Sequence, residues 1–180
     1  WGATKDGTSF RDLIRIHQKV CETVAYAHAQ GVIHRDLKPE NIMVGEYGEV
    51  YVVDWGLAKI FAPDDQASGV TLTGAPERSA AGNGVTQDGA VVGTPAYMAP
   101  EQASGDTESI GIHTDVYALG ALLYRLLTGR LAYPDSGTTA TILARVLEGP
   151  PEPIHAVTDG VPEPLIAICE KAMERDPGMR

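Results

Sequence analysis

The segment from Asp115 to Thr128 places the strongest constraint on how this chain can fold. Read as a helix, it carries apolar side chains on most of its sides, at Val116, Leu119, Leu122, Leu123, Leu126 and Leu127. A helix that is apolar nearly all round has to be enclosed by other elements. With Gly129 as its stop, the segment predicts a fold built around one central, buried helix.

A second long helix is predicted over residues 9–30, with Ser9 as its N-cap and Gly31 as its stop. Its apolar positions follow helical spacing and form one buried stripe of Phe10, Leu13, Ile14, Val20, Cys21, Val24, Ala27 and His28. His17 and His28 fall on or near this stripe. We expect both to be packing histidines with satisfied ring nitrogens rather than metal ligands or catalytic bases.

The remaining elements are shorter. Two apolar runs, 42–44 and 50–53, flank a glycine-bearing turn and predict a β-hairpin. Residues 140–147 and 164–174 read as two short helices, separated by a proline-rich segment. Residues 62–92 have no sustained apolar period and predict a long loop.

Bulk composition excludes several classes of protein. The chain has 180 residues, 43% of them hydrophobic, which suits one globular domain rather than a disordered chain. Its net charge is −10 and its 14 Lys and Arg residues form no long block, which argues against a nucleic-acid partner. An acidic surface is compatible with basic protein substrates.

The chain also lacks the signatures of secreted and membrane proteins. Cys21 and Cys169 are too few and too far apart for a disulfide scaffold or a zinc motif. The longest apolar run is too short to cross a bilayer. We therefore expect reduced thiols and a cytoplasmic chain, although the full-length protein could be membrane-anchored. Because the first residue is Trp1 rather than Met, we also expect the natural N-terminus to lie upstream.

The octapeptide His34–Asn41 combines three groups that phosphoryl transfer needs. Asp36 can orient an attacking hydroxyl and accept its proton, and Lys38 can neutralise charge on the transferred phosphate. The amide of Asn41 can bind a magnesium ion. The octapeptide resembles the catalytic loop of protein kinases, in the Lys-Pro-Glu form typical of serine/threonine kinases.

Asp54-Trp55-Gly56 follows Asp36 by eighteen residues, where protein kinases carry an Asp-Phe-Gly triplet. The resemblance implies that Asp54 binds magnesium and that Trp55, in place of Phe, packs against the helical core. Asn41 and Asp54 lie at the start and the end of the predicted hairpin. One small rigid unit would therefore hold both metal ligands.

Residues 93–101 resemble the end of the kinase activation segment, which would run here from 54 to 101. The resemblance implies that Thr94 bonds to the catalytic Asp and Lys and shapes the acceptor site. It also implies an ion pair between Glu101 and Arg180.

Asp115 begins a run that resembles the start of the central kinase helix. A carboxylate there could be a plain N-cap, could accept backbone hydrogens from the catalytic loop as it does in the family, or could do both.

Arg35 precedes the catalytic Asp, and kinases with this arginine are often switched by phosphorylation of the activation loop. We expect Thr86 to be the first candidate acceptor, before the other loop hydroxyls Thr71, Thr73 and Ser79.

Taken together, the resemblance covers nearly the whole chain and is closest to bacterial serine/threonine kinases. It implies a protein kinase-like α+β fold in which residues 1–180 form the mainly α-helical C-terminal lobe with a small β-hairpin. ATP and Mg²⁺ are the implied cofactors. The implied site residues are Asp36, Lys38 and Thr94 for catalysis, Lys38, Asn41, Met43 and Asp54 for ATP, and His34, Trp55, Glu101, Asp115 and Arg180 for structure.

The resemblance predicts transfer of the ATP γ-phosphate to Ser/Thr hydroxyls of proteins, with dimerisation as a route to phosphorylation of the activation loop. The N-terminal lobe that would hold ATP is missing from this chain. Since correct positioning is worth roughly 7–11 kcal/mol, we expect the fragment alone to be inactive. The alternatives are a pseudokinase or scaffold module, which the retained catalytic groups disfavour, and a small-molecule kinase, which the Ala-Pro-Glu segment disfavours.

Overall fold

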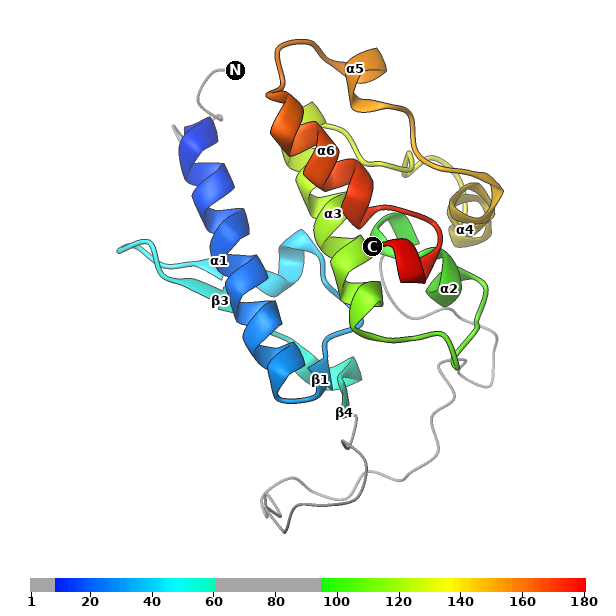
Figure 1. Ribbon diagram of the computed structural model, residues 1–180, viewed down its shortest axis with the longest axis horizontal. Helices are drawn as coiled ribbons and strands as arrows, with labels where there is room; N and C mark the ends of the chain where they lie inside the picture. Colours follow the sequence, from blue (N-terminus) through cyan, green and yellow to red (C-terminus); the bar gives the residue numbers. More distant parts are fainter. Residues whose placement is uncertain (1–8, 61–94) are drawn as a thin grey trace, which may run out of the picture.

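The computed structural model describes residues 9–60 and 95–180, and Figure 1 shows their arrangement. The helices and strands, in chain order, are α1 (Phe10–Ala29), β1 (Val32–Ile33), β2 (Ile42–Val44), β3 (Val50–Val52), β4 (Lys59–Ile60), α2 (Pro100–Ala103), α3 (Ile112–Thr128), α4 (Thr139–Glu148), α5 (Ile154–Val157) and α6 (Glu163–Ala172). Single 3₁₀ turns lie at Pro39–Asn41, Trp55–Leu57, Pro95–Tyr97 and Pro177–Met179.

The central helix predicted from the apolar pattern is α3. It packs against α1, α5 and α6, and most of its residues are buried. Figure 1 shows α3 in the middle of the molecule, between α1 on one side and α2 and α4 on the other. The prediction of a central buried helix is confirmed, but α3 begins at Ile112, three residues before Asp115.

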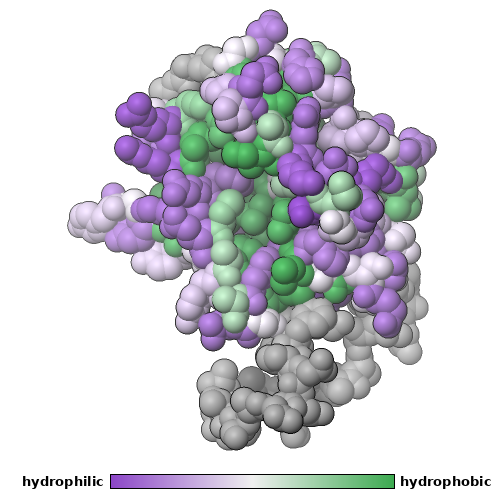
Figure 2. Space-filling view, in the orientation of Figure 1, coloured by the Kyte–Doolittle hydropathy of each residue, from purple (hydrophilic) through white to green (hydrophobic). Residues whose placement is uncertain are grey.

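Helix α1 is also confirmed. The side chain of Ser9 caps it by accepting a hydrogen bond from the Asp12 backbone N–H at 3.2 Å. Gly31, just beyond its end, has a φ of 74°, a left-handed conformation that glycine adopts without strain. Val20 and Val24 are its fully buried residues. In Figure 2, a band of apolar side chains runs down the middle of the face where α1 and α3 lie side by side.

The strands form two small antiparallel sheets. The predicted hairpin is the β2–β3 pair, in which Met43 lies opposite Tyr51. The Lys19 ammonium donates to the Gly48 carbonyl at 2.6 Å and ties the hairpin turn to α1. The second sheet pairs β1 with β4 and was not predicted, because strands of two residues leave no periodic signal in a sequence.

The C-terminal elements largely follow the predicted pattern. Helices α4 and α6 occupy the two segments predicted as short helices, with shifts of one or two residues at their ends. The four-residue helices α2 and α5 were not predicted. The loop predicted over residues 62–92 lies outside the described residues.

Both cysteines are free thiols, as expected. Cys169 lies on the buried side of α6, where desolvation raises its pKa to about 12, so it stays protonated. Along the described residues, none of the helices is both long and apolar enough to span a bilayer.

A buried ion pair connects α2 to the C-terminal end of the chain. The Arg180 guanidinium donates to both carboxylate oxygens of Glu101, at 2.6 and 2.9 Å, and the two side chains are 1% and 4% exposed. The Thr114 hydroxyl donates to the same carboxylate at 3.0 Å. The guanidinium also lies over the Tyr117 ring, 4.8 Å from its centroid. The contact implied for Glu101 and Arg180 is therefore present, with both partners fully enclosed.

Replacing Arg180 with Leu should destabilise the protein by about 3–5 kcal/mol, because it leaves the Glu101 carboxylate buried without its partner. Arg15→Leu is the matched control. Arg15 forms an exposed pair with Asp12, at 3.6 Å and with side chains 65% and 51% exposed, so its loss should cost about 1 kcal/mol or less. Chemical denaturation of the three proteins measures both differences, and equal costs would contradict the role of the buried pair.

The effect of Arg180→Leu should also depend on pH. Burial acts to raise the pKa of Glu101, but the hydrogen bonds and charge of Arg180, together with hydrogen bonds from the backbone and Thr114, outweigh it and hold that pKa below its ordinary value of 4.5. A lowered folded-state pKa gives a stabilisation that is complete above pH 4.5 and is lost as the pH falls through the lowered value. The stability difference between wild type and Arg180→Leu should therefore shrink in acid, and a difference that stays constant down to pH 2 would contradict this.

Candidate active site

One carboxylate, that of Asp115, fixes the start of the octapeptide loop. It is 1% exposed and accepts three hydrogen bonds of 2.8 Å, from the backbone N–H groups of His34 and Arg35 and from Nε2 of His28. Asp115 lies inside the first turn of α3, and the N-cap of this helix is Gly111. The interpretation of Asp115 as a plain N-cap is therefore wrong, and the contact with the loop backbone is present.

His34 joins this loop to the hairpin. Its ring is fully buried, with Nδ1 3.3 Å from the Asp36 backbone N–H and Nε2 3.1 Å from the Val53 carbonyl. Because the first contact needs an acceptor and the second a donor, the geometry assigns the neutral tautomer with hydrogen on Nε2. The ring of Trp55 lies 4.6 Å from the His34 ring, and its Nε1 donates to the Val52 carbonyl at 2.9 Å. Trp55 therefore packs against the loop with its polar atom satisfied.

Asp36, Lys38 and Asn41 converge in a partly open site. The Lys38 ammonium is 2.6 Å from Oδ2 of Asp36, and these side chains are 19% and 12% exposed. The Asn41 amide donates to the Asp36 carbonyl at 2.8 Å and approaches Oδ2 at 3.4 Å. Lys38 and Asn41 thus contact the same carboxylate oxygen, Oδ2, and Oδ1 of Asp36 remains able to accept a hydrogen bond from a hydroxyl. The arrangement places a base and a cation on one side of a shared space.

Asn41 and Asp54 are brought together by the hairpin. The backbone N–H of Val53 donates to the Asn41 carbonyl at 2.9 Å, and Asp54 is the next residue along the chain. Asn41 donates its amide hydrogens to Asp36, which leaves its side-chain oxygen for a cation. The Asp54 carboxylate is exposed and forms no ion pair in the part of the chain that the structure describes. One amide oxygen and one carboxylate suit Mg²⁺, which completes its shell with water and phosphate oxygens.

The backbone is strained on each side of this site. Among the described residues other than glycine, only Arg35, with φ of 70°, and Asp54, with φ of 63°, adopt positive values. Each costs on the order of 1–3 kcal/mol and persists only where surrounding contacts hold it. The N–H of Arg35 donates to Asp115, and its carbonyl accepts from Gln102 Nε2 at 2.8 Å. Arg35 is thus held by side chains of two other elements, Asp115 of α3 and Gln102 of α2.

The side chain of Arg35 has spare hydrogen-bonding capacity. Its NH1 reaches the Leu57 carbonyl at 3.5 Å, and its buried Nε has no partner among the described residues. An unpaired buried donor costs about 1–3 kcal/mol, so this position favours an additional acceptor.

The remaining predicted site residues are not tested by these contacts. Met43 is 57% exposed on the hairpin, opposite Tyr51. Thr94 and all four candidate phosphorylation sites, Thr71, Thr73, Ser79 and Thr86, lie outside the described residues.

Sequence reasoning did not identify two of the contacts that position the loop. His28 is a packing histidine with a satisfied ring nitrogen, as expected, but its partner, the carboxylate that holds the loop, was not foreseen. Its place on a buried stripe was the available signal, since a buried polar group needs a buried partner. Gln102 was not singled out, and its bond to Arg35 spans 67 positions of the chain, so no local pattern could have revealed it.

The comparisons with known proteins agree with this geometry. Residues 3–180 match the protein kinase domain. Over 129 residues, 71% of this chain and 13% of the relative, the sequence is 50% identical to the serine/threonine-protein kinase PknD of Protochlamydia amoebophila. It is 37% identical to PknD of Chlamydia muridarum over 98% of this chain and 19% of that protein. It is 33% identical to PknB of Mycobacterium tuberculosis over 97% of this chain and 27% of that protein.

The chain therefore spans less than a third of the length of these curated relatives.

Replacing His28 with Leu should loosen the octapeptide loop, because Asp115 would keep its buried charge with one donor fewer. We expect a loss of about 1–3 kcal/mol in stability and faster amide hydrogen exchange at His34 and Arg35. His28→Gln is the matched variant, since its amide can still donate to Asp115 and should restore most of the protection. Hydrogen exchange followed by mass spectrometry measures the protection of His34 and Arg35 in both variants. Equal exchange in His28→Leu and His28→Gln would contradict the role of the hydrogen bond.

Proposed function

Because this chain belongs to the protein kinase family, we propose that the protein containing it transfers the γ-phosphate of ATP to serine and threonine hydroxyls of other proteins. The observation that carries the proposal is the convergence of Asp36, Lys38 and Asn41 on one site braced by Asp115. The names of the relatives, all serine/threonine-protein kinases, support the choice of acceptor.

In this proposal Asp36 is the catalytic base. Lys38 and Asn41 engage its Oδ2, so Oδ1 accepts the hydrogen bond of the substrate hydroxyl and later its proton. The Lys38 ammonium would stabilise the charge of a bound γ-phosphate. The pairing of Lys38 with Asp36 also keeps the carboxylate oriented between turnovers.

Asn41 and Asp54 would hold Mg²⁺ through one amide oxygen and one carboxylate. The bound cation neutralises charge on the ATP phosphates. The hairpin bond between Val53 and Asn41 sets the spacing of these ligands before any cation binds. Val53, directly before the left-handed Asp54, is held at its N–H by the Asn41 carbonyl and at its carbonyl by His34.

We assign residues 1–180 to the C-terminal lobe of the kinase domain, with the activation segment at 54–101. Met43 and Tyr51 lie opposite each other on the hairpin and are 57% and 55% exposed, an apolar pair that a nucleotide base and the other lobe would cover. Thr94 would shape the acceptor site in this arrangement. A cytoplasmic location and dimerisation during phosphorylation of the activation segment remain predictions.

Arg35 is the proposed sensor of that phosphorylation. Its buried Nε lacks a partner among the described residues, and a phosphate supplies the oxygen acceptors that a guanidinium binds in a bidentate manner. Thr86 is the first candidate to carry the phosphate.

Asp36→Asn in the full-length protein should lower the rate of phosphate transfer by at least about 10²-fold, since the amide cannot accept the proton. The fold should persist, because Asp36 is not part of the Asp115 contacts. Transfer of labelled phosphate from ATP to a Ser/Thr protein substrate measures the effect, with Glu163→Gln as an exposed control that keeps full activity. Residues 1–180 alone should show negligible turnover, and measurable turnover by this fragment would contradict the lobe assignment.

Arg35→Met should remove the activation that follows phosphorylation of the activation segment, while the unphosphorylated protein keeps its basal rate. A coupling of 1–3 kcal/mol corresponds to a stimulation of roughly 5–150-fold in the wild type. Rates before and after phosphatase treatment give this ratio for each protein. Thr86→Ala should show the same loss of stimulation, and an undiminished ratio in Arg35→Met would rule out the proposed sensor.

A further inference from the structure

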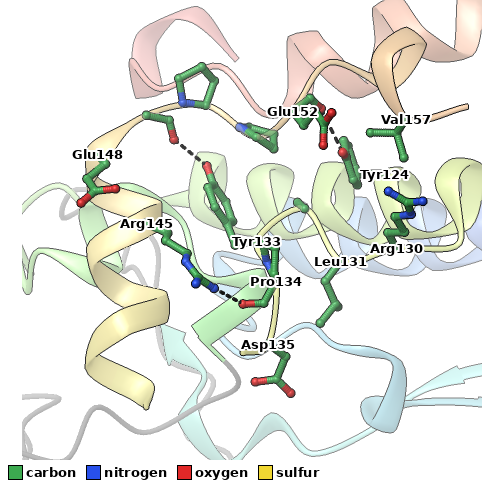
Figure 3. Close-up of a pocket in the computed structure, with 14 residues that line it drawn as sticks. Tyr124, Arg130, Leu131, Tyr133, Pro134, Asp135, Arg145, Glu148, Glu152 and Val157 are labelled. Carbon is green, nitrogen blue, oxygen red and sulfur yellow. Dashed lines mark hydrogen bonds between the residues drawn. The ribbon is translucent and has the colours of Figure 1, made fainter. Parts of the chain in front are cut away.

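A hollow of about 650 Å³ lies at the C-terminal end of α3, away from the octapeptide loop (Figure 3). Its wall is built from the end of α3, the loop 130–135, α4, the proline-rich segment 149–152 and α5. The loop is held by Asp115 in the first turn of α3, whereas the hollow is lined by Tyr124 near the end of that helix. The two sites therefore occupy different ends of the central helix.

The wall of this hollow is fixed and mainly apolar. The Tyr133 hydroxyl donates to the Gly149 carbonyl at 3.1 Å, and the Tyr124 hydroxyl donates to the Glu152 carbonyl at 2.9 Å. Arg145 donates to the Pro134 carbonyl at 2.8 Å. Figure 3 shows these three bonds tying the wall segments together. Because these polar atoms already have partners, a ligand would gain most from apolar contact with the tyrosine rings, Leu131 and the prolines.

The rim of the hollow is acidic. Asp135, Glu148 and Glu152 are exposed at its edge, and Glu170 and Glu174 line an adjoining hollow of about 340 Å³ that shares residues 150–152. None of these five carboxylates forms an ion pair within the residues that the structure describes.

The basic side chains of this region offset the rim only in part. Arg145 and Arg175 donate to backbone carbonyls of Pro134, Val146 and Leu147, which fixes their guanidinium groups in the wall. Arg130 is the third basic residue that lines these hollows. Five carboxylates thus face three arginines, of which two are committed to the wall.

We propose that this hollow is a docking site for a basic segment of the substrate protein, in which an apolar side chain fills the hollow and flanking Lys or Arg side chains meet the acidic rim. The inference rests on the proposed kinase function for its choice of partner. Charge complementarity selects the occupant, since a polycation gains from the rim and an anionic surface is repelled. A second copy of this chain, with a net charge of −10, is a poor occupant for the same reason.

The position of the rim fits a substrate that also reaches the catalytic loop. Helix α4, which forms part of the wall of the hollow, packs against the turn Pro95–Tyr97. Arg125 of α3 donates to the Tyr97 hydroxyl and joins this turn to the central helix. The turn directly follows Thr94 in the sequence, the residue expected to shape the acceptor site. A segment held at the hollow would therefore lie next to this turn.

Binding should be tested with a fluorescent nonapeptide of sequence Lys-Arg-Lys-Leu-Pro-Leu-Arg-Lys-Arg, which has no hydroxyl to phosphorylate. The full-length protein carrying Asp36→Asn is used without ATP, so that binding is read independently of transfer. The double variant Glu148→Lys with Glu152→Lys reverses the charge at two positions of the rim. The control pair, Glu22→Lys with Glu46→Lys, makes the same change in net charge on α1 and the hairpin. A peptide with Gly-Gly-Gly at its centre tests the apolar contact.

We expect fluorescence anisotropy to give a Kd that the rim variant weakens about tenfold and the control pair changes less than twofold. The Gly-centred peptide should also bind about tenfold more weakly. Equal weakening by the two double variants would overturn the proposal, because it would indicate nonspecific attraction to an acidic protein. Equal binding of the two peptides would overturn it as well, because no apolar group would then be needed.

A kinetic experiment separates this proposal from the kinase function itself. Attaching the basic segment to a short Ser-containing peptide should lower its KM for the active full-length protein and leave kcat unchanged. The rim variant should lose only this gain in KM. Absence of transfer to either peptide would contradict the kinase function, whereas transfer with no difference in KM would contradict the docking site alone.

Discussion

The carboxylate of Asp115 is the contact on which the arrangement of the site depends. Three donors from two other segments converge on it, and at 1% exposure no water competes with them. A carboxylate enclosed in this way is stable only when its lone pairs are filled, so the energetic cost of losing one donor falls on all three contacts. The same group therefore joins the central helix, helix α1 and the loop, and it holds Arg35 in a backbone conformation that the residue does not otherwise favour.

A chain of hydrogen bonds connects the residues held by Asp115 to the rest of the site. His34 uses one ring nitrogen on the Asp36 backbone and the other on Val53, and Val53 in turn bonds to Asn41. The backbones of Asp36, Asn41 and Val53 are thus linked to one another, and the side chains of Lys38 and Asn41 add contacts to the Asp36 carboxylate. Such preorganisation matters because phosphoryl transfer depends mainly on positioning and on charge stabilisation. The Trp55 ring, packed on His34, supports the same bonds from the side, which explains how a larger aromatic is tolerated there.

The sequence predicted the parts of this structure that have a local signal. Apolar periodicity identified α3 and α1, and the glycine-bearing turn identified the β2–β3 hairpin. The motifs also pointed to the Glu101–Arg180 contact. The sequence could not reveal the β1–β4 pair or the hydrogen bond from Gln102 to Arg35, because these contacts connect positions far apart in the chain. Asp115 shows what the resemblance added: its residue type alone allowed a helix cap, whereas the resemblance also implied a contact with the loop backbone, which is present at His34 and Arg35.

The length of α3 limits which substrates could contact the sites at both of its ends. From Asp115 to Tyr124 the helix advances nine residues, or about 14 Å at 1.5 Å per residue. An extended peptide covers about 3.3 Å per residue, so about four residues span this length of the helix. The turn Pro95–Tyr97 is joined to α3 through Arg125 and packs against α4, which lines the hollow. Spacing, in addition to charge, would then select which basic segments can dock productively.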